Sequence, residues 1–520
     1  MRKNLLALSI AAMVGGLSGA ANAQVALFNN SATTNDAWTT GAPSLVGASP
    51  LAPATGLAPT TTGVGHILVV PYFTTQGANH TLLNITNTDL VNGKAVKLRY
   101  RGAANSDDVF DITVYLSPGD VWAADVAEEN GFSRLVTDDN SCTLPSKADI
   151  KATNNGRFKV NRVRGADAAQ TREGYVEILN TADIPPVLSG GTTPNPLYAA
   201  IKHNADGVAP CTAAVMDLQA TALNFTDVNS SNTPRNRGYS WPTGGLFANW
   251  LIVNVATNAS FSGEAVALRA TAAGANAAGN VVWFPQTTDN VAQPNALQLT
   301  ADPLLGSGVV RAAMYDFPDL STPYTSTAAN PSAQANDLAL QLETQSVTNE
   351  YLTAASSGGF ATDWVFSMPT RRYAVAMFYG ANAPANGIAT NVAVNRHFSG
   401  IAPLGNVTAN ANWQLCVDAG NQRGFDREER SKTTFVISPD QGLRFCGETS
   451  VLSFNSATSA VLGAQIATQQ IQTGFADGWF TVRTPGFNTG VNAGLPVIGY
   501  SAAKANSGNL GGTWVHRTAP

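Results

Sequence analysis

The sequence predicts a mainly β protein built from antiparallel β-sandwich domains, which we expect to number two, with one short helical segment. Short segments rich in β-branched and aromatic residues recur from His66 onward, and residues 109–116 alternate between apolar and polar positions. Turn sequences such as SPGD at residues 117–120 separate them roughly every 10–15 residues, a spacing typical of antiparallel sandwiches. A parallel α/β sheet would instead need helices between successive strands.

Composition limits the classes of partner. Charged residues make up 12% of the 520 residues and the net charge is −5, whereas hydrophobic residues make up 44%. The apolar share is enough for sizeable cores, so the surface must consist mainly of neutral polar side chains. Binding to nucleic acid requires clusters of Lys and Arg that neutralise phosphates. We find no such basic patch in the sequence and expect no nucleic-acid partner.

Residues 1–23 are predicted to be a cleavable secretory signal peptide. Arg2 and Lys3 form a positively charged start, residues 5–19 form a short apolar stretch, and residues 21–23 (ANA) match the pattern that signal peptidases cut. The apolar stretch is shorter than the roughly 20 residues that span a bilayer, and an uncleaved anchor is the alternative. We find no transmembrane segment in the mature sequence. The expected location is the cell surface or the extracellular medium, with the periplasm as a further option.

Three segments are predicted after the signal peptide. Residues 24–64, rich in Ala, Thr, Gly and Pro, are expected to form a flexible N-terminal arm or linker. Residues 65–235 are expected to form the first β-sandwich domain and residues 236–520 a second β-rich domain. A faint internal repeat supports duplication, because residues 82–99 align without gaps with a segment 170 residues later. Chance similarity between two generic strand pairs is the alternative.

One segment departs from the strand pattern. Apolar side chains recur at roughly helical spacing from Leu338 to Tyr351, and Asn336 is a suitable N-cap. We therefore expect a helix over about residues 337–352, packed on a sheet or at a domain junction.

The chain has four cysteines, Cys142, Cys211, Cys416 and Cys446, without the spacing of a zinc site. An even number in an exported chain predicts disulfide bonds. Three connectivities are possible. We prefer Cys142–Cys211 and Cys416–Cys446, because each bridge then stays inside one predicted domain and stabilises it by roughly 3–4.5 kcal/mol in the chain-entropy model. Free buried thiols are the alternative.

The densest charge cluster of the sequence lies at residues 426–430 (DREER). Asp418, Asp426 and Glu428 are the candidate Ca²⁺ ligands of this region, because Ca²⁺ binds carboxylate oxygens. The two arginines of the run would neutralise such a site. A structural ion-pair cluster is therefore the favoured interpretation, and no cofactor is expected.

No catalytic motif stands out in the sequence. The histidines show no HExxH spacing, and no GxSxG motif occurs. An SxxK pattern at residues 501–504 lacks the partner motifs of the enzymes that use it. We therefore predict no catalytic residues.

Most tryptophans lie in predicted strands beside Val, Leu or Phe, where a core position is the default. Exposed tryptophans could instead stack on sugars. Trp241, within the turn sequence WPTGG, is the best candidate for an exposed ring.

The order of a series of short segments, spread over about residues 65–500, carries a resemblance to a known family. The segments are residues 70–74 (VPYFT), 81–87 (TLLNITN), 115–122 (YLSPGDVW), 246–255 (LFANWLIVNV), 317–323 (FPDLSTP), 349–351 (NEY), 362–370 (TDWVFSMPT), 425–429 (FDREE) and 494–499 (GLPVIG). Their order resembles that of uncharacterised exported proteobacterial proteins labelled "cell surface protein". The resemblance implies a location at the cell surface and transfers no catalytic residue.

These observations favour a non-catalytic, exported structural protein of the cell surface, such as a surface-layer, coat or fibre subunit. Residues 25–28 could then add as a strand to the sheet of a neighbouring copy. The alternative is an extracellular binding module for glycans or envelope components, which would show exposed aromatic side chains on one sheet face. A secreted hydrolase is less favoured. The expected partners are the chain itself or other envelope proteins and glycans.

Overall fold

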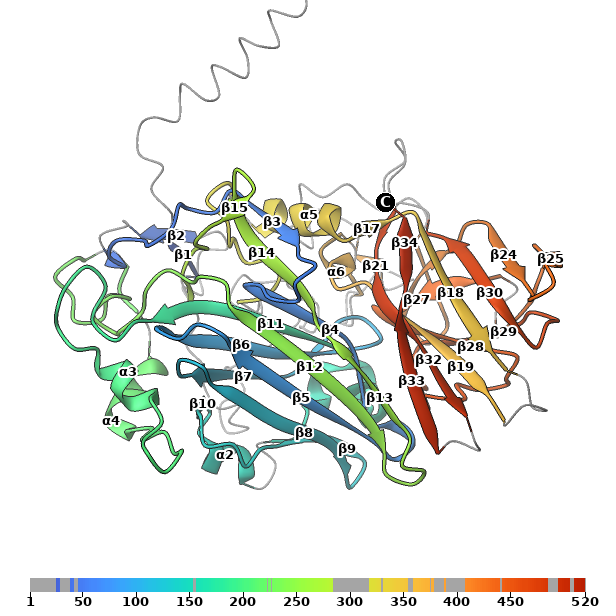
Figure 1. Ribbon diagram of the computed structural model, residues 1–520, viewed down its shortest axis with the longest axis horizontal. Helices are drawn as coiled ribbons and strands as arrows, with labels where there is room; N and C mark the ends of the chain where they lie inside the picture. Colours follow the sequence, from blue (N-terminus) through green and yellow to red (C-terminus); the bar gives the residue numbers. More distant parts are fainter. Residues whose placement is uncertain are drawn as a thin grey trace, which may run out of the picture.

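The computed structural model describes most of the chain and shows a β-rich molecule (Figure 1). The described residues are 25–28, 38–41, 45–152, 156–221, 223–225, 227–283, 318–328, 331–353, 359–374, 376–377, 388–389, 407–439, 442–484, 494–505 and 509–519. The predicted signal peptide lies outside them.

The first half of the chain forms a sandwich of two antiparallel sheets. The first sheet has the order β10 (Cys142–Leu144), β7 (Asp108–Leu116), β6 (Gly93–Gly102), β11 (Glu173–Ile184), β4 (Ile67–Thr74), β14 (Val266–Ala272) and β15 (Ala275–Asn276), with β3 (Gly56–Pro59) also beside β14. The second sheet has the order β13 (Ser260–Glu264), β12 (Leu246–Asn254), β5 (Asn79–Asn87), β8 (Val121–Glu129) and β9 (Phe132–Val136).

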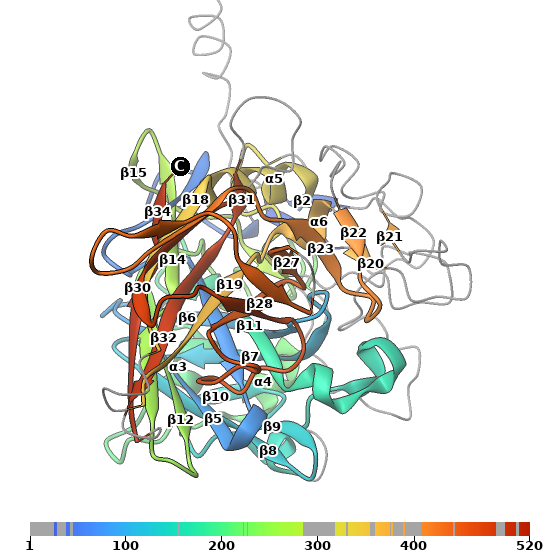
Figure 2. The ribbon, with the colours of Figure 1, turned by 90° about the vertical axis from the view of Figure 1, so that its right-hand side faces the viewer.

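The second half forms another sandwich, drawn in yellow to red in Figure 1 and nearest the viewer in Figure 2. The third sheet has the order β26 (Val436–Ser438), β29 (Thr468–Gln472), β28 (Thr449–Phe454), β19 (Ala361–Ser367), β32 (Ile498–Ala505) and β33 (Leu510–Val515). The fourth sheet has the order β25 (Ser431–Lys432), β24 (Gln422–Phe425), β30 (Asp477–Arg483), β18 (Ser346–Leu352) and β34 (Arg517–Ala519). Only the β28–β29 pair of these two sheets is parallel in the described residues.

Smaller elements complete the fold. Further sheets join β22 (Val407–Ala409), β23 (Leu415–Asp418) and β27 (Arg444–Cys446), β17 (Glu343–Thr344) and β31 (Leu495–Pro496), and β20 (Ala376–Met377) and β21 (Ile388–Ala389). The helices are α2 (Lys147–Lys151), α3 (Pro196–Ile201), α4 (Ala213–Gln219), α5 (Pro331–Gln341) and α6 (Arg371–Ala374). The prediction of a mainly β, antiparallel sandwich architecture is confirmed.

The predicted apolar strand at residues 25–28 forms β1 (Val25–Phe28). It pairs in parallel with β16 (Val282–Trp283) and antiparallel with β2 (Trp38–Gly41). The structure thus gives this strand a sheet edge within its own chain.

The central strands of the third sheet, β19, β28 and β32, are buried on both of their faces. On one face, Trp364 and Phe366 of β19 pack with Phe480 of the fourth sheet in the core of the second sandwich. On the other face, Val365 and Tyr500 belong to the same apolar core as the first sandwich. Because successive residues of a strand point to opposite faces, one strand serves both cores. The two sandwiches therefore share one wall.

A loop at residues 459–466 joins the two halves through two buried carboxylates. Asp363 of β19 accepts hydrogen bonds from the hydroxyls of Ser453 and Ser459, both at 2.6 Å, and from the backbone N–H groups of residues 460–462 at 2.9–3.2 Å. Glu173 of β11 accepts from the N–H groups of residues 465 and 466 at 2.8 and 2.6 Å. The loop is thus held from both sides, once by each sandwich.

The edges of the second and third sheets also meet. The Thr513 hydroxyl of β33 donates to the Ser262 carbonyl of β13. A Cβ atom on Gly511 would lie 2.3 Å from the Ser260 carbonyl oxygen, so only glycine permits this approach. The rings of Trp250 and Tyr500 pack against each other near this junction, with centroids 4.6 Å apart and an interplanar angle of 32°.

The structure differs from the predicted domain limits in two places. Strands β12 and β14 follow the expected boundary near residue 235 but pair with β5 and β4, so the first sandwich extends beyond that boundary. Part of the expected flexible arm is built into the fold, because β3 pairs with β14 and Leu57 is buried. Both differences have the same cause. The predicted limits rest on local composition, whereas the strands concerned pair with strands that lie far away in the sequence.

The helix expected over about residues 337–352 is wrong in its second half. Helix α5 begins at Pro331 and ends at Gln341, and residues 346–352 form β18. Asn336 lies inside the helix and is not its N-cap. A spacing of four, as from Val347 to Tyr351, puts two side chains on the same side of a strand as well as of a helix. In the structure both side chains enter the core of the second sandwich.

Replacing Asp363 by alanine is expected to lower the stability of the whole chain, because five donors lose their acceptor in a buried setting. The expected loss is roughly 3–5 kcal/mol, visible as a lower Tm in thermal unfolding. Asp206→Ala, in an exposed loop, is the control. Equal Tm values for the two variants would contradict this account of the joining loop.

Candidate functional site

Both preferred cysteine pairs are bonded in the structure. Cys142 of β10 is bonded to Cys211, just before α4, with an S–S distance of 2.09 Å. Cys416 of β23 and Cys446 of β27 lie directly opposite each other and are bonded at 2.05 Å. The described residues contain no free cysteine. Such bonds are compatible with an exported protein, since they persist in oxidising compartments.

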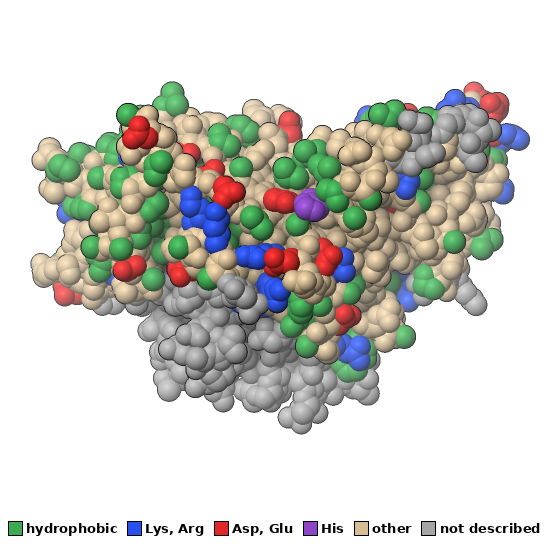
Figure 3. Space-filling model, turned by 90° about the horizontal axis from the view of Figure 1, so that it is seen from below, with side chains coloured by type: hydrophobic (Ala, Val, Ile, Leu, Met, Phe, Trp, Pro, Cys, Tyr) green, Lys and Arg blue, Asp and Glu red, His purple; other side chains and the backbone are tan. Residues whose placement is uncertain are grey.

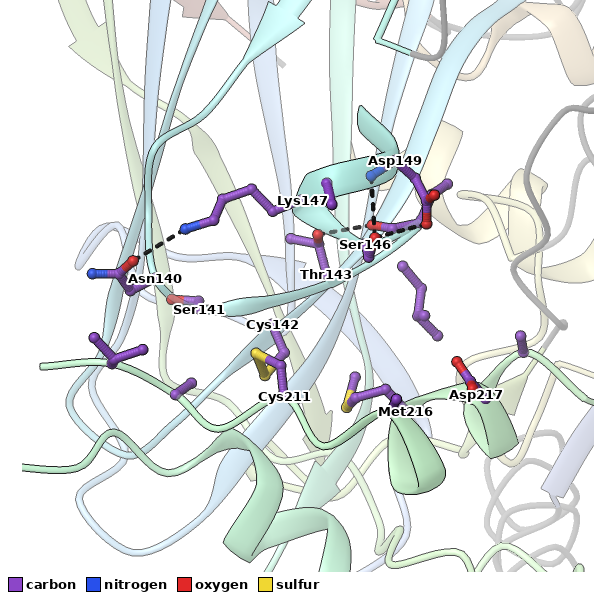
Figure 4. Close-up of a pocket in the computed structure, with 17 residues that line it drawn as sticks. Asn140, Ser141, Cys142, Thr143, Ser146, Lys147, Asp149, Cys211, Met216 and Asp217 are labelled. Atoms are coloured by element: carbon purple, nitrogen blue, oxygen red, sulfur yellow. Dashed lines mark hydrogen bonds between the residues drawn. A yellow bond between two sulfur atoms is a disulfide. The ribbon is translucent and has the colours of Figure 1, made fainter. Parts of the chain in front are cut away.

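A cavity of about 630 Å³ lies beside the Cys142–Cys211 bond (Figure 4). Leu144 and Pro145 line one side, and Val208 and Met216 line the other. Two of the polar side chains that line it have local partners. The Lys147 ammonium donates to the Asp139 carbonyl at 2.6 Å, and Ser146 caps α2 through the N–H of Asp149. The cavity is thus a largely apolar pocket between the two segments that the disulfide joins.

The candidate calcium ligands each face an arginine. Asp418 pairs with Arg444 at 2.9 Å, Asp426 pairs with Arg430, and Glu428 lies 3.6 Å from the same Arg430 guanidinium. Hydrogen bonds from Arg430, together with those from the backbone, hold the pKa of the Asp426 carboxyl below its usual value, although desolvation opposes them. Within the described ranges, no group of three or more His, Cys, Asp or Glu residues could hold a metal ion.

A ladder of buried ion pairs runs along β6. Its cations lie on one strand, and their carboxylate partners come from β7 and β11, which flank it. The pairs are Lys94–Asp183 (2.8 Å), Lys97–Asp111, Arg99–Asp108 (3.0 Å) and Arg101–Glu177 (3.1 Å), and every one of these side chains is at most 5% exposed. Burial lowers the pKa of Lys97 and raises that of Glu177. Losing one partner would leave a buried charge unpaired, so the ladder fixes the register of these strands.

Two of the described histidines are buried and hydrogen-bonded to the backbone. His66 lies 2.9 Å from the Ala277 carbonyl and His516 lies 2.9 Å from the Val365 carbonyl. Desolvation lowers the pKa of each to about 3. Both rings are therefore neutral at ordinary pH, and both are parts of the cores in which they lie.

The tryptophan expected to be exposed is buried. Trp241 is 1% exposed, and its indole N–H donates to the Gly47 carbonyl at 2.9 Å. The prediction was wrong because the segment after residue 235 folds against the first sandwich. Among the described tryptophans, Trp479 of β30 (38% exposed) and Trp514 of β33 (47% exposed) are exposed instead.

Trp479 belongs to an aromatic stack on the outer face of the fourth sheet. Its ring lies parallel to that of Phe425 on β24, with centroids 4.1 Å apart and an interplanar angle of 9°. The Arg423 guanidinium lies over the Phe425 ring, 4.7 Å from its centroid. Phe425 is therefore covered on both faces, whereas Trp479 has one ring face without an aromatic or cationic neighbour among the described side chains.

A straight row of polar residues crosses four strands beside this stack. The backbone register places Arg517, Thr348, Thr481 and Arg423 side by side on β34, β18, β30 and β24. The Thr348 and Thr481 hydroxyls are 2.8 Å apart and hydrogen-bonded. We define the Trp479 face as Trp479, Phe425 and this row.

The sequence contains a signal for the Trp479 face. In residues 477–483 (DGWFTVR), Phe480 and Val482 are fully buried, and Trp479 and Arg483 are exposed. The alternation that predicts this strand thus also predicts an outward tryptophan. Its ring stack with Phe425 depends on the pairing of two strands far apart in the sequence.

Charged side chains are sparse on much of the molecule. On the face seen in Figure 3 they gather in a band between wide areas of neutral side chains. With 12% of residues charged, a concentration of arginines around one exposed ring is a distinguishing feature of the fourth sheet.

Comparison with known proteins adds no assignment. No family model, no curated protein and no solved structure matches the chain. In the part of the chain that is described, no helix has the length and apolar character needed to cross a membrane.

His516 makes the second sandwich sensitive to acid. Its pKa is lowered to about 3 from 6.5, so the folded state loses stability as the pH falls from 6.5 towards 3, by roughly 5 kcal/mol at most. In His516→Gln this component is absent. The Tm difference between wild type and variant should therefore shrink from pH 7 to pH 4 in thermal unfolding. His80→Gln, at a half-exposed site, is the control, and an unchanged difference for His516→Gln would contradict the prediction.

Proposed function

We propose that this chain is a non-catalytic, exported structural protein of the cell surface, such as a surface-layer, coat or fibre subunit. In this role, contacts with copies of itself or with envelope proteins and glycans hold it at the surface. The proposal also accounts for the resemblance to exported cell-surface proteins.

The shared third sheet is the observation that supports this proposal best. It makes the two sandwiches one body, because its two faces belong to the two cores. The joining loop at residues 459–466 and the two disulfides add further links. A body of this kind keeps its surfaces at fixed positions, which suits a building unit.

A second candidate function is an extracellular binding module for glycans. The Trp479 face favours it, since an exposed aromatic ring beside hydroxyl and guanidinium groups is suited to sugars. The two functions are compatible, because a structural protein can be retained at the surface by glycan contacts. A secreted hydrolase is the least favoured of the three functions.

Fractionation of native host cells, followed by electron microscopy of the purified full chain, tests the structural role. The chain is expected in the envelope or extracellular fraction, and the purified particles are expected to form a lattice or fibres. A chain recovered only from the cytoplasm would overturn export. Isolated monomers under all assembly conditions would overturn the structural role and leave the binding module.

A further inference from the structure

We propose that the Trp479 face binds an acidic polysaccharide, one that carries carboxylate or sulfate groups. This inference rests on the proposed role as a surface protein held by noncovalent contacts, and it names the ligand class and the site. The outer side of the fourth sheet supplies three features that such a ligand requires: a free aromatic ring, unpaired cations and a row of hydroxyls.

The ring of Trp479 offers one unoccupied stacking surface. Phe425 covers its other side at 4.1 Å, and Arg423 closes the far side of Phe425. The three groups therefore form an ordered stack with one open end. The negative face of an aromatic ring attracts weakly positive edges and C–H groups. The apolar face of a sugar ring presents such C–H groups, so it can lie against the open side of Trp479.

The cations around this ring indicate a negatively charged ligand. Within the described part of the chain, Arg423, Arg483 and Arg517 form no ion pair with a carboxylate, and all three are exposed. Glu350, opposite Trp479 on β18, is the one acid that the register places in the same rows. Guanidinium groups bind carboxylate and sulfate-like oxygens through two parallel N–H donors.

The geometry of the row fits an extended chain. Arg517 and Arg423 mark its ends, and three strand spacings separate them, or about 14 Å. The hydroxyls of Thr348 and Thr481 lie between them and bind each other. Each hydroxyl can also accept or donate a further hydrogen bond. A short oligosaccharide across the strands would thus meet a cation, two hydroxyls and a second cation, with Trp479 beside it.

A contrasting pair on the first sandwich shows what is special about this site. Arg157 lies over the ring of Phe132, 5.1 Å from its centroid, much as Arg423 lies over Phe425. Unlike Arg423, Arg157 has a carboxylate nearby: Glu129 lies 3.9 Å from it and also pairs with Arg134 at 2.8 Å. The Phe132–Arg157 pair therefore serves as a matched control.

Affinity electrophoresis and titration calorimetry with the full chain test the proposal. The probes are polygalacturonate, alginate and heparin, which carry carboxylates or sulfates. Fully methyl-esterified galacturonan has the same backbone without charge and is the control ligand. We expect binding to at least one acidic probe, weaker binding to the esterified one, and affinity that falls with added salt because exposed charges are screened. Comparison of the three probes separates carboxylate from sulfate recognition.

Two variants assign the binding to the Trp479 face. Trp479→Ala should weaken binding roughly tenfold, since it removes the stacking surface. The double variant Arg423→Gln with Arg517→Gln should weaken binding and reduce its salt dependence. Both change exposed side chains, and their Tm values check the fold. Phe132→Ala and Arg157→Gln should bind as the wild type does.

Four results would overturn the proposal. The first is no binding to any of the three acidic probes, and the second is unchanged binding in both folded variants. The third is tighter binding to oligothymidylate than to every polysaccharide. The fourth is a change of oligomeric state in Trp479→Ala without a change in polysaccharide binding. The last two would assign the face to nucleic acid or to a second copy of the chain. Variants that lose polysaccharide binding in solution but remain in the envelope fraction would support the site and show that other contacts retain the protein.

Discussion

Burial of the central strands of the third sheet on both faces is the constraint on which the rest of the structure depends. Strands in this position have no solvent side, so a polar side chain on them costs free energy unless a partner inside the protein compensates it. Asp363 is an example, because its carboxylate accepts hydrogen bonds from the Ser453 hydroxyl of β28 and, in the joining loop, from the Ser459 hydroxyl and three backbone N–H groups. Glu173 holds the same loop from the first sandwich. Apolar packing and buried carboxylates thus act at the same junction.

Because the third sheet is shared by the two sandwiches, the fourth sheet is the one sheet of the second sandwich that faces solvent. The fourth sheet buries Val347, Phe480 and Val482 against the third and turns its other side to solvent. Its outward side chains are not needed for packing, which is why an aromatic stack and unpaired arginines can collect there. The first sandwich uses its charges differently. There the cations of β6 are buried and matched one by one with carboxylates. Basic side chains therefore fix the strand register in the first sandwich, whereas on the fourth sheet they are exposed and not paired with carboxylates.

The sequence predicts local features of this fold well and long-range ones poorly. Alternation in residues 109–116 correctly indicates a strand, and the preference for bridges inside one predicted domain correctly selects the bonded pairs from three connectivities. The spacing of Val347 and Tyr351 led to the wrong prediction of a helix. A spacing of four fits both a helix and a strand, and only pairing with β30 decides between them. The boundary near residue 235 failed because β12 returns to β5. The turn sequence around Trp241 contains no sign of the segment that covers it, whereas the alternation in residues 477–483 does indicate that Trp479 points outward.

The stack of Phe425 and Trp479 has an optical consequence. Trp122, Trp241 and Trp364 are at most 1% exposed, so their indole emission comes from apolar surroundings that small quenchers do not reach. Trp479, at 38% exposure, contributes a component that water and quenchers do reach. The fourth sheet therefore carries one of two exposed indoles in the described chain, the other being Trp514 of β33 at 47% exposure. In a Trp514→Phe chain, the exposed emission would report on what lies against the fourth sheet, without a label.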